Sequence, residues 1–395
     1  MQFDMVFEGG GAKGMVFVGA MKALEAGNHT SGRVVGTSAG AITATLLAVG
    51  YNAADMEKAL GEKDDEGNPV FASFMDPPAA EDFTPVDVDD SVTMKLFKTI
   101  NLPLIPEWAE ERADKAIIAR LMGLKAYAVL FSFIERGGLY VGNAFLDWLR
   151  KKLKEKGASY ADMTLAQLYG KTGRDLSLVA TDTAGHNMLV LNHRTAPNCP
   201  VAWAVRMSMS IPFAWHEVRW QAAWDPYRRY SEDGTRVQKE MKLAGHTIVD
   251  GGVLSNFPID MLTSDEPSVR AVMGDTIPKR EAVLGLLIDE MLEVENAPPP
   301  PDDDENDEEG VAGNIKKLRT VKRVSRLLNT MMKAHDKRLI GANKDLICHL
   351  PAETYGTMEF DMTDERKAAL VAAGEKAMNA HLAGRLGLQE RTSWS

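Results

Sequence analysis

Hydrophobic and polar positions in the first fifty residues form two kinds of segment that follow one another. Short apolar runs at residues 3–7 and 33–36 each lead through a glycine-rich turn into a longer stretch of helical composition, at 15–26 and 39–49. Each helical stretch closes at a glycine, Gly27 or Gly50. A strand, a tight turn and a helix, repeated twice, are typical of βαβ units. The pattern therefore predicts an α/β fold with a mainly parallel sheet.

The alternation is interrupted and then resumes. Residues 61–136 begin with a polar, turn-rich piece and continue through apolar stretches, which indicates an insertion with its own helices. The next expected elements are a helix at 143–156, strands at 176–181 and 188–192, a helix near 201–209, and strands at 246–249 and 282–289. We therefore expect one domain over 1–290 that contains the insertion.

The last hundred residues differ in composition. Residues 293–310 contain four prolines and an acidic run, a composition that cannot pack apolar surface, so we expect a surface loop or linker. Beyond it, within 311–395, the pattern predicts a basic amphipathic helix at 314–339, a strand at 345–350 and a helix at 364–382. We expect this part to pack back on the first domain.

Composition narrows the class of protein. The formal net charge of −11 argues against general affinity for nucleic acid. The two cysteines are too few for a disulfide framework and are not spaced like metal ligands, which favours a reducing compartment. The chain shows neither a secretory signal nor an apolar run long enough to span a membrane. We expect a cytoplasmic protein with at most peripheral membrane contact, and the oligomeric state stays open.

The glycine run GGGAKG, from Gly9 to Gly14, lies between the first strand and the first helix. Backbone N–H groups at such a turn converge on an anion. The run satisfies G-x-G-x-x-G, but the second strand ends in Gly36 and Thr37 rather than in the acidic residue that would hold a ribose. A phosphate-binding P-loop also fails, because Gly14 rather than Ser or Thr follows Lys13. Nucleotide binding is therefore disfavoured here.

The second strand instead delivers GTSAG, a G-x-S-x-G pattern centred on Ser38. Small residues on both sides allow a sharp turn that presents the serine hydroxyl at the sheet edge, with a helix N-terminus behind it. Ser38 is a candidate nucleophile. The competing interpretation is a serine that caps the following helix. The neighbouring glycine run favours the nucleophile, since an acyl-transfer intermediate needs N–H donors beside the attacked carbonyl.

A serine nucleophile needs a base, and Asp250 is the candidate. It ends the strand HTIV and precedes Gly251 and Gly252, so it lies at a third glycine turn, although an ordinary Asp-Gly turn would look the same. A Ser-His-Asp arrangement would need His335 or His349. His335 falls inside the basic helix, and His349 follows Cys348 in a strand-like run. His216 and His246 fall in loops, and we interpret them as structural.

GGGAKG, GTSAG and DGG in this order resemble the patatin-like phospholipase family. The stretches TGRDLSLVATD, VAWAVRMSMSIPF and DGGVLSNFP look like the sequence of that family around its inner strands and its aspartate. The resemblance covers residues 1 to about 289, and the strand and helix after Asp345 look like the usual C-terminal end of the family. The insertion and the acidic segment match no family pattern.

The resemblance implies a three-layer α/β/α fold and a lipid acyl hydrolase with a Ser-Asp dyad, in which Ser38 is the nucleophile and Asp250 the base. The family's oxyanion loop and its supporting motif positions map onto Gly9, Gly10, Gly11, Ala39, Lys13, Gly14, Gly36, Gly40, Gly251 and Gly252. No metal and no other cofactor is implied, and the partner is an acyl-ester lipid. Two alternatives remain: an effector lipase gated by a ligand or partner, and a catalytically weak regulatory protein.

Two segments outside these motifs have expected roles. The insertion at 61–136 is rich in apolar residues and follows closely after the helix that Ser38 precedes, so we expect it to form a lid over Ser38. The alternative is that its helices only enlarge the hydrophobic core. The basic helix at 314–339 has one apolar face and crowded lysines and arginines, so we expect it to lie on an anionic surface. Membrane lipid and the acidic run at 302–309 are both candidates for that surface.

Overall fold

The computed structural model of the chain describes residues 1–79, 82–83, 125–231, 237–274, 280–299 and 337–392, together with 323 and 330. In this part of the chain, the main sheet has the strand order β12-β11-β1-β2-β4-β10-β7, and β5 pairs with β4. The parallel strands are β1 (Gln2–Phe7), β2 (Thr30–Thr37), β4 (Leu176–Asp182), β11 (Val283–Asp289) and β12 (Ile347–Pro351). The antiparallel strands are β5 (Asn187–Leu191), β7 (Val218–Arg219) and β10 (Thr247–Asp250).

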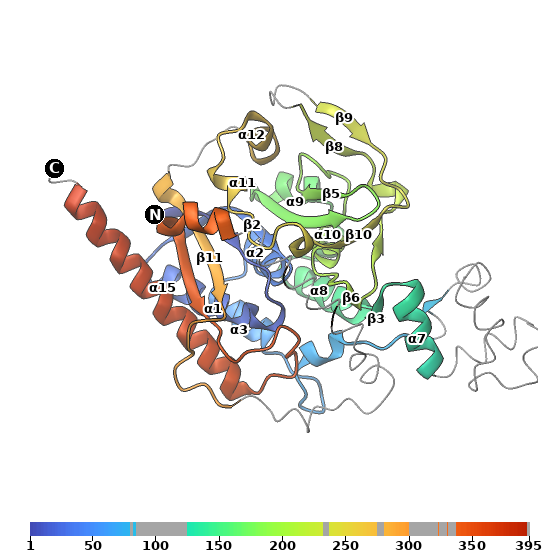
Figure 1. Cartoon of the computed structure of the whole chain (residues 1–395), viewed down its shortest axis with the longest axis horizontal. Helices are drawn as coiled ribbons and strands as arrows, with labels where there is room; N and C mark the ends of the chain where they lie inside the picture. The colour runs from blue at the N-terminus through green and yellow to red at the C-terminus, as the bar shows by residue number, and fades with distance from the viewer. Residues whose placement is uncertain are drawn as a thin grey trace, which may run out of the picture.

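Both faces of the sheet are buried, and Figure 1 shows the helices arranged around it. Along β1, Met5 and Phe7 point into one hydrophobic core and Val6 into a second, because successive strand side chains alternate between faces. The first core is covered by the helices α1 (Val16–Ala26), α2 (Ala39–Ala48), α3 (Ala53–Leu60), α8 (Asn143–Lys156), α10 (Val201–Ser208) and α15 (Asp364–Thr392). The second is covered by α11 (Asp260–Thr263), α12 (Pro267–Met273) and residues near Leu346. The fold is the expected three-layer α/β/α sandwich.

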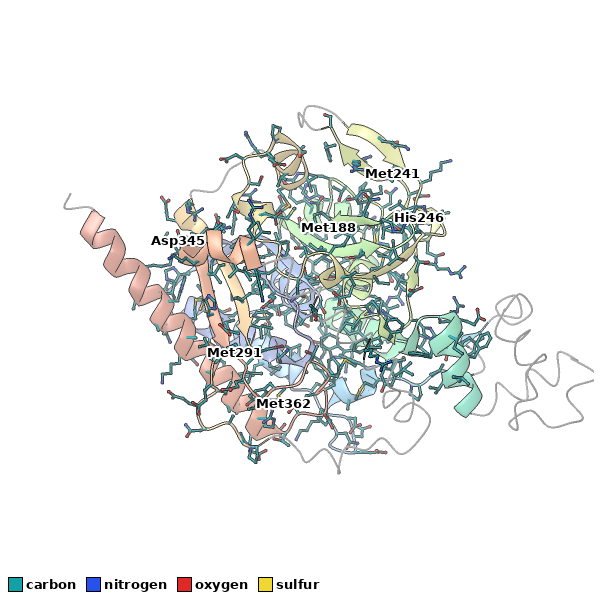
Figure 2. The ribbon with its side chains drawn as sticks, viewed as in Figure 1. Met188, Met241, His246, Met291, Asp345 and Met362 are labelled. Atoms are coloured by element: carbon teal, nitrogen blue, oxygen red, sulfur yellow. The ribbon has the colours of Figure 1, made fainter. Side chains whose placement is uncertain are left out.

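The C-terminal elements belong to this sandwich. β12 pairs with β11 at the edge of the sheet, and α15 runs along α1 in Figure 1. A Cβ on Gly19 would overlap the carbonyl oxygen of Val371, and one on Gly374 would overlap that of Val16. The two helices therefore approach with their backbones almost in contact, which only glycine at both positions permits. Met291 and Met362 lie at the end of the molecule where α15 begins (Figure 2).

The predicted elements that lie within the described residues are confirmed, with shifts of a few residues at their ends. The largest difference is at the last helix, which we expected over 364–382 and which extends to Thr392. The sequence did not indicate that β5, β7 and β10 run antiparallel to their neighbours. Among the described residues, no helix combines the length and low polarity needed to cross a membrane.

Parts of the predicted insertion and of the segments after residue 299 lie outside the description. Of 61–136, the structure describes η2 (Val70–Phe74), α7 (Lys125–Glu135) and neighbouring residues. Phe74 and Phe131 are each 1% exposed, so these pieces add to the core. Residues 80–81 and 84–124, the acidic run at 302–309 and most of the basic helix at 314–339 lie outside the described residues. The lid and the anionic-surface contact remain predictions.

Candidate active site

The nucleophile candidate Ser38 lies on a strained turn between β2 and α2. Its φ of 53° and ψ of −120° are unusual for a residue with a side chain, and such strain concentrates at functional positions. A Cβ on Gly36 would overlap the carbonyl of Gly40, and one on Gly40 would overlap that of Phe7. The turn therefore needs its glycines. Ser38 is the residue that precedes α2, but its side chain makes no capping hydrogen bond. The helix-cap interpretation is therefore wrong.

Strand pairing brings Asp250 to the same place. β5 occupies one edge of β4 from Leu178 to Asp182, so β2 and β10 must share the opposite edge. β2 ends with Thr37 opposite Val179, and β10, running the other way, ends with Asp250 opposite Ala180. The carboxyl ends of β2 and β10 thus meet head-on at neighbouring positions along β4. Ser38 and Asp250 are adjacent because β10 is antiparallel.

The Asp250 carboxyl is buried, with 1% of the residue exposed. Burial raises its pKa to about 7, against smaller opposing effects of the Gly252 N–H, which donates to Oδ1 at 2.7 Å, and of the Ser38 hydroxyl. Although Ser38 interacts with the carboxyl, no hydrogen bond of normal geometry reaches Oδ2 among the described residues. This oxygen is the one left to accept a proton. The carboxyl therefore has the basicity that proton abstraction near neutral pH requires.

The glycine run lies against the serine turn. A Cβ on Gly9 would be 3.0 Å from Cβ of Ser38, and one on Gly14 would be 2.8 Å from Cβ of Ala39. The Gly9 N–H donates to the Asn256 carbonyl at 3.1 Å and is not available as a donor, which corrects its expected place in the oxyanion hole. Among the described residues, no loop carbonyl accepts from the N–H of Gly10, Gly11 or Ala39.

Contacts behind the glycine run fix its course. The Ala12 N–H donates to the Thr357 carbonyl at 2.9 Å, so the loop after β12 supports the run. Gly11 has φ +58°, which favours glycine. Lys13 is 3% exposed and forms an ion pair with Glu290, so its side chain is not solvated.

A group of buried polar residues that the sequence analysis did not single out surrounds the dyad. The Ser208 hydroxyl accepts from the Ser38 N–H at 3.0 Å and donates to the Val179 carbonyl at 2.6 Å. The Ser210 carbonyl accepts from the Asp250 N–H at 2.9 Å. Arg206 is 3% exposed and donates to the Ser210 hydroxyl and to carbonyls of Val141, Gly142 and His216. The sequence signal that could have identified these residues is the alternation of Arg206, Ser208 and Ser210 within an otherwise apolar stretch.

None of the described histidines we considered forms the relay of a triad. His216 contacts Ser132 at 2.5 Å, and burial lowers its pKa to about 3. His246 pairs with Asp182 at 2.9 Å and lies near Met241, the last residue of the hairpin of β8 (Tyr227–Tyr230) and β9 (Val237–Met241), in Figure 2. His349 pairs with Asp289 at 2.8 Å. His335 lies outside the described residues.

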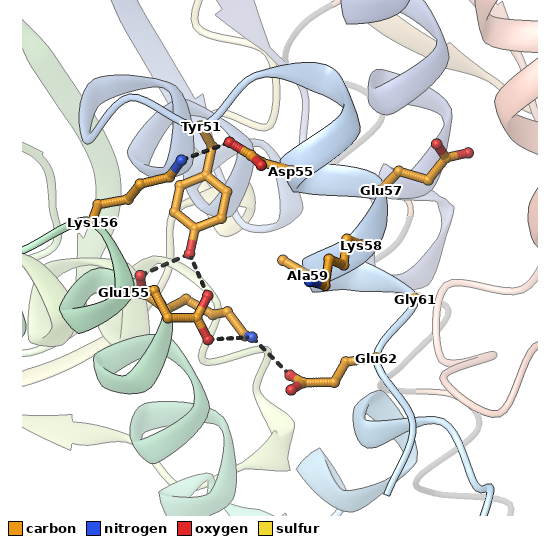
Figure 3. A pocket seen from close by; sticks show the side chains of 10 residues that line it. Tyr51, Asp55, Glu57, Lys58, Ala59, Gly61, Glu62, Glu155 and Lys156 are labelled. Atoms are coloured by element: carbon orange, nitrogen blue, oxygen red, sulfur yellow. Dashed lines mark hydrogen bonds and ion pairs between the residues drawn. The ribbon is translucent and has the colours of Figure 1, made fainter.

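A cleft of about 640 Å³ lies elsewhere, between α3 and α8. Several of its charged side chains pair with one another: Lys156 pairs with Asp55, and the buried Lys152 pairs with Glu62 and Glu155, as the dashed lines in Figure 3 show. The cleft does not include the dyad. Among the described residues, no cluster of three or more histidine, cysteine or acidic side chains could hold a metal ion.

With this geometry in view, the comparison with known proteins defines the class. The model of the patatin-like phospholipase family matches residues 5–263. The chain therefore belongs to the patatin-like phospholipase family, whose general kind is a lipid hydrolase. The matched region contains the glycine run, the serine turn and Asp250, whereas β11, β12 and α15 follow it.

Individual relatives are more distant. YqhO of Bacillus subtilis (strain 168), described as uncharacterized, is 27% identical over 384 residues, which cover 95% of this chain and 96% of that protein. A patatin-like phospholipase domain-containing protein of Cryptococcus neoformans is 25% identical over 134 residues, 34% of this chain and 14% of that protein. VipD of Legionella pneumophila aligns over 97% of this chain and 67% of its own, at 18% identity and a TM-score of 0.45. ExoU of Pseudomonas aeruginosa, solved with SpcU, aligns over 98% and 53%, at 16% identity and a TM-score of 0.40.

Proposed function

We propose that this protein hydrolyses the acyl ester bonds of lipids, with phospholipids as the expected class, through a dyad of Ser38 and Asp250. The observation that carries the proposal is the meeting of a strained serine with a buried carboxyl whose pKa is raised to about 7. Its family membership supports a lipid substrate. No metal or other cofactor is needed for the steps below.

In the first step, the Asp250 carboxylate takes the proton of the Ser38 hydroxyl as its oxygen attacks the ester carbonyl. The carbonyl oxygen becomes negative and lies beside the glycine run, where the N–H groups of Gly10, Gly11 and Ala39 are the proposed donors. Collapse of this intermediate returns the proton from Asp250 to the leaving alcohol and leaves an acyl group on Ser38. Water, deprotonated by Asp250, then releases the fatty acid and regenerates the serine.

The test is hydrolysis of a chromogenic short-chain ester, followed by mass spectrometry of lipid extracts from cells that make each variant. Ser38→Ala is expected to abolish hydrolysis, and Asp250→Asn to lower kcat at least about a hundredfold, the usual contribution of a general base. His349→Ala, which removes a half-exposed partner of Asp289, is the matched control and should retain most activity. Loss of activity in the folded His349 variant would replace the dyad by a triad. Unchanged turnover in Ser38→Ala would remove the proposed nucleophile.

A further inference from the structure

Phe213 has an unusual backbone conformation. Its φ is +67°, a region that a bulky residue rarely adopts. The strand β6 (Phe213–Trp215) pairs with β3 (Gly138–Tyr140), and the Phe213 N–H donates to the Gly137 carbonyl at 2.8 Å. Neighbouring structure therefore holds the strained residue in place.

Core packing does not explain the strain. The ring of Phe213 belongs to neither hydrophobic core and is partly exposed, whereas Trp215, two residues further along the same strand, is fully buried. Its described ring contact is with Phe133 of α7, at 5.8 Å between ring centroids. A strained aromatic residue kept at the surface indicates a role for its side chain outside the core.

The strained residue follows directly on the segment that fixes the dyad. Ser208 binds the Ser38 N–H and Ser210 binds the Asp250 N–H, so the chain leaves the catalytic centre at Ser210 and reaches Phe213 within three residues. The intervening Ile211 and Pro212 are also partly exposed. Ile42 lies one turn into α2 after Ser38, packs against the first core and is partly exposed as well.

The apolar surface continues onto α7. Leu130, Phe133 and Ile134 are spaced to share one side of this helix, and Ile134 is 51% exposed. The Phe133–Phe213 contact joins this side to the segment that leads from the dyad. In Figure 1, α7 lies at the margin of the described part of the molecule.

We propose that Phe213, with Ile211 and Phe133, receives the acyl chain of the ester attacked by Ser38, and that Phe213 thereby sets the preference for long acyl chains. This inference rests on the proposed function. An acyl chain bound to Ser38 has to leave the catalytic centre along apolar surface that water would otherwise cover. The path from Ile211 through Phe213 to Phe133 offers such surface. Because the backbone of Phe213 is already fixed, binding of the acyl chain costs this residue little conformational entropy.

The experiment compares Phe213→Gly with the full-length wild type on acetyl and octanoyl esters of one chromogenic alcohol, below the concentration at which either aggregates. Glycine adopts φ +67° without strain, so this variant removes the ring and keeps the local backbone conformation favourable. We expect kcat/KM for the octanoyl ester to fall roughly tenfold, the order expected for lost apolar contact in a pocket, and that for the acetyl ester to change less than about twofold. Phe133→Ala should shift the same ratio in the same direction.

His186→Gly is the matched control, because His186 has φ +56° on the exposed turn between β4 and β5. It should leave the ratio of octanoyl to acetyl hydrolysis unchanged. An unchanged ratio in both Phe213→Gly and Phe133→Ala, or an equal fall on both esters, overturns the assignment of the acyl chain while the proposed hydrolase stands. If Ser38→Ala hydrolyses both esters as fast as the wild type does, the proposed function itself fails, and this inference fails with it.

Discussion

At the scale of single residues, the burial that raises the pKa of Asp250 works against the folded state. A carboxyl with a pKa of about 7 holds its proton in the folded protein at pH values where the unfolded chain, with a pKa of 3.8, has already released it. Raising the pH from about 4 to about 7 therefore favours the unfolded state progressively. Above pH 7 both states are ionised and the destabilisation stays constant.

Asp250→Asn should therefore be more stable than the wild type above pH 7 and lose that advantage near pH 4. The upper limit is on the order of 4 kcal/mol, since each pKa unit corresponds to about 1.4 kcal/mol. The measurement is the free energy of unfolding by urea for both proteins at several pH values. Ser38→Ala is the control, because the hydroxyl lowers the pKa and its loss should not stabilise the protein. An Asp250→Asn advantage of equal size at pH 4 and pH 8 would contradict the raised pKa.

At the scale of elements, the glycine run needs residues without a side chain because neighbouring elements pack directly against it. A Cβ on Gly10 would overlap Cδ1 of Ile288, the end of a flexible side chain on β11, whereas one on Gly11 would overlap the backbone carbonyl of Thr357. Shortening the Ile288 side chain would remove the first overlap, whereas no side-chain substitution would remove the second. A variant at Gly10 therefore tests displacement of the N–H donors without a general loss of folding.

We expect Gly10→Ala to lower kcat more than it raises KM, because moving one oxyanion donor costs about 3 kcal/mol in the transition state. The double variant Gly10→Ala with Ile288→Val, which removes Cδ1, should recover much of that loss. Steady-state kinetics of the wild type, both single variants and the double variant give the answer. If Ile288→Val restores nothing while all four proteins fold, the run is not positioned by this contact.

The sequence predicted these turns because each combines a strand end, small residues and a helix start within ten residues. It did not predict what holds them, because Arg206, Ser208, Glu290 and Thr357 contribute through contacts between segments far apart in the chain. Local pattern also says nothing about strand direction in a sheet. The antiparallel course of β10, which brings Asp250 to Ser38, therefore appeared only in the structure.

At the scale of the whole molecule, the residues that support the site extend beyond the region matched by the family model. Residues 5–263 carry Ser38 and Asp250, yet β11 pairs with β1, and Thr357 holds the glycine run. α15 packs along α1, the helix that begins where this run ends. We therefore expect the C-terminal part and the matched region to unfold together.

Two of the glycines of α15, Gly374 and Gly384, test this coupling with opposite signs. A Cβ on Gly374 would overlap the Val16 carbonyl of α1, whereas one on Gly384, on the same helix, has no neighbour within 4 Å. Gly374→Ala should lower the free energy of unfolding by about 1–3 kcal/mol through overpacking, and Gly384→Ala should raise it by up to about 1 kcal/mol through helix propensity. Urea unfolding followed by the fluorescence of buried tryptophans such as Trp215, far from α15 in sequence, should report both changes in a single transition. Because Trp215 lies within the matched region, a midpoint that stays unchanged in Gly374→Ala while helical signal is lost earlier would show that α15 unfolds independently of the catalytic centre.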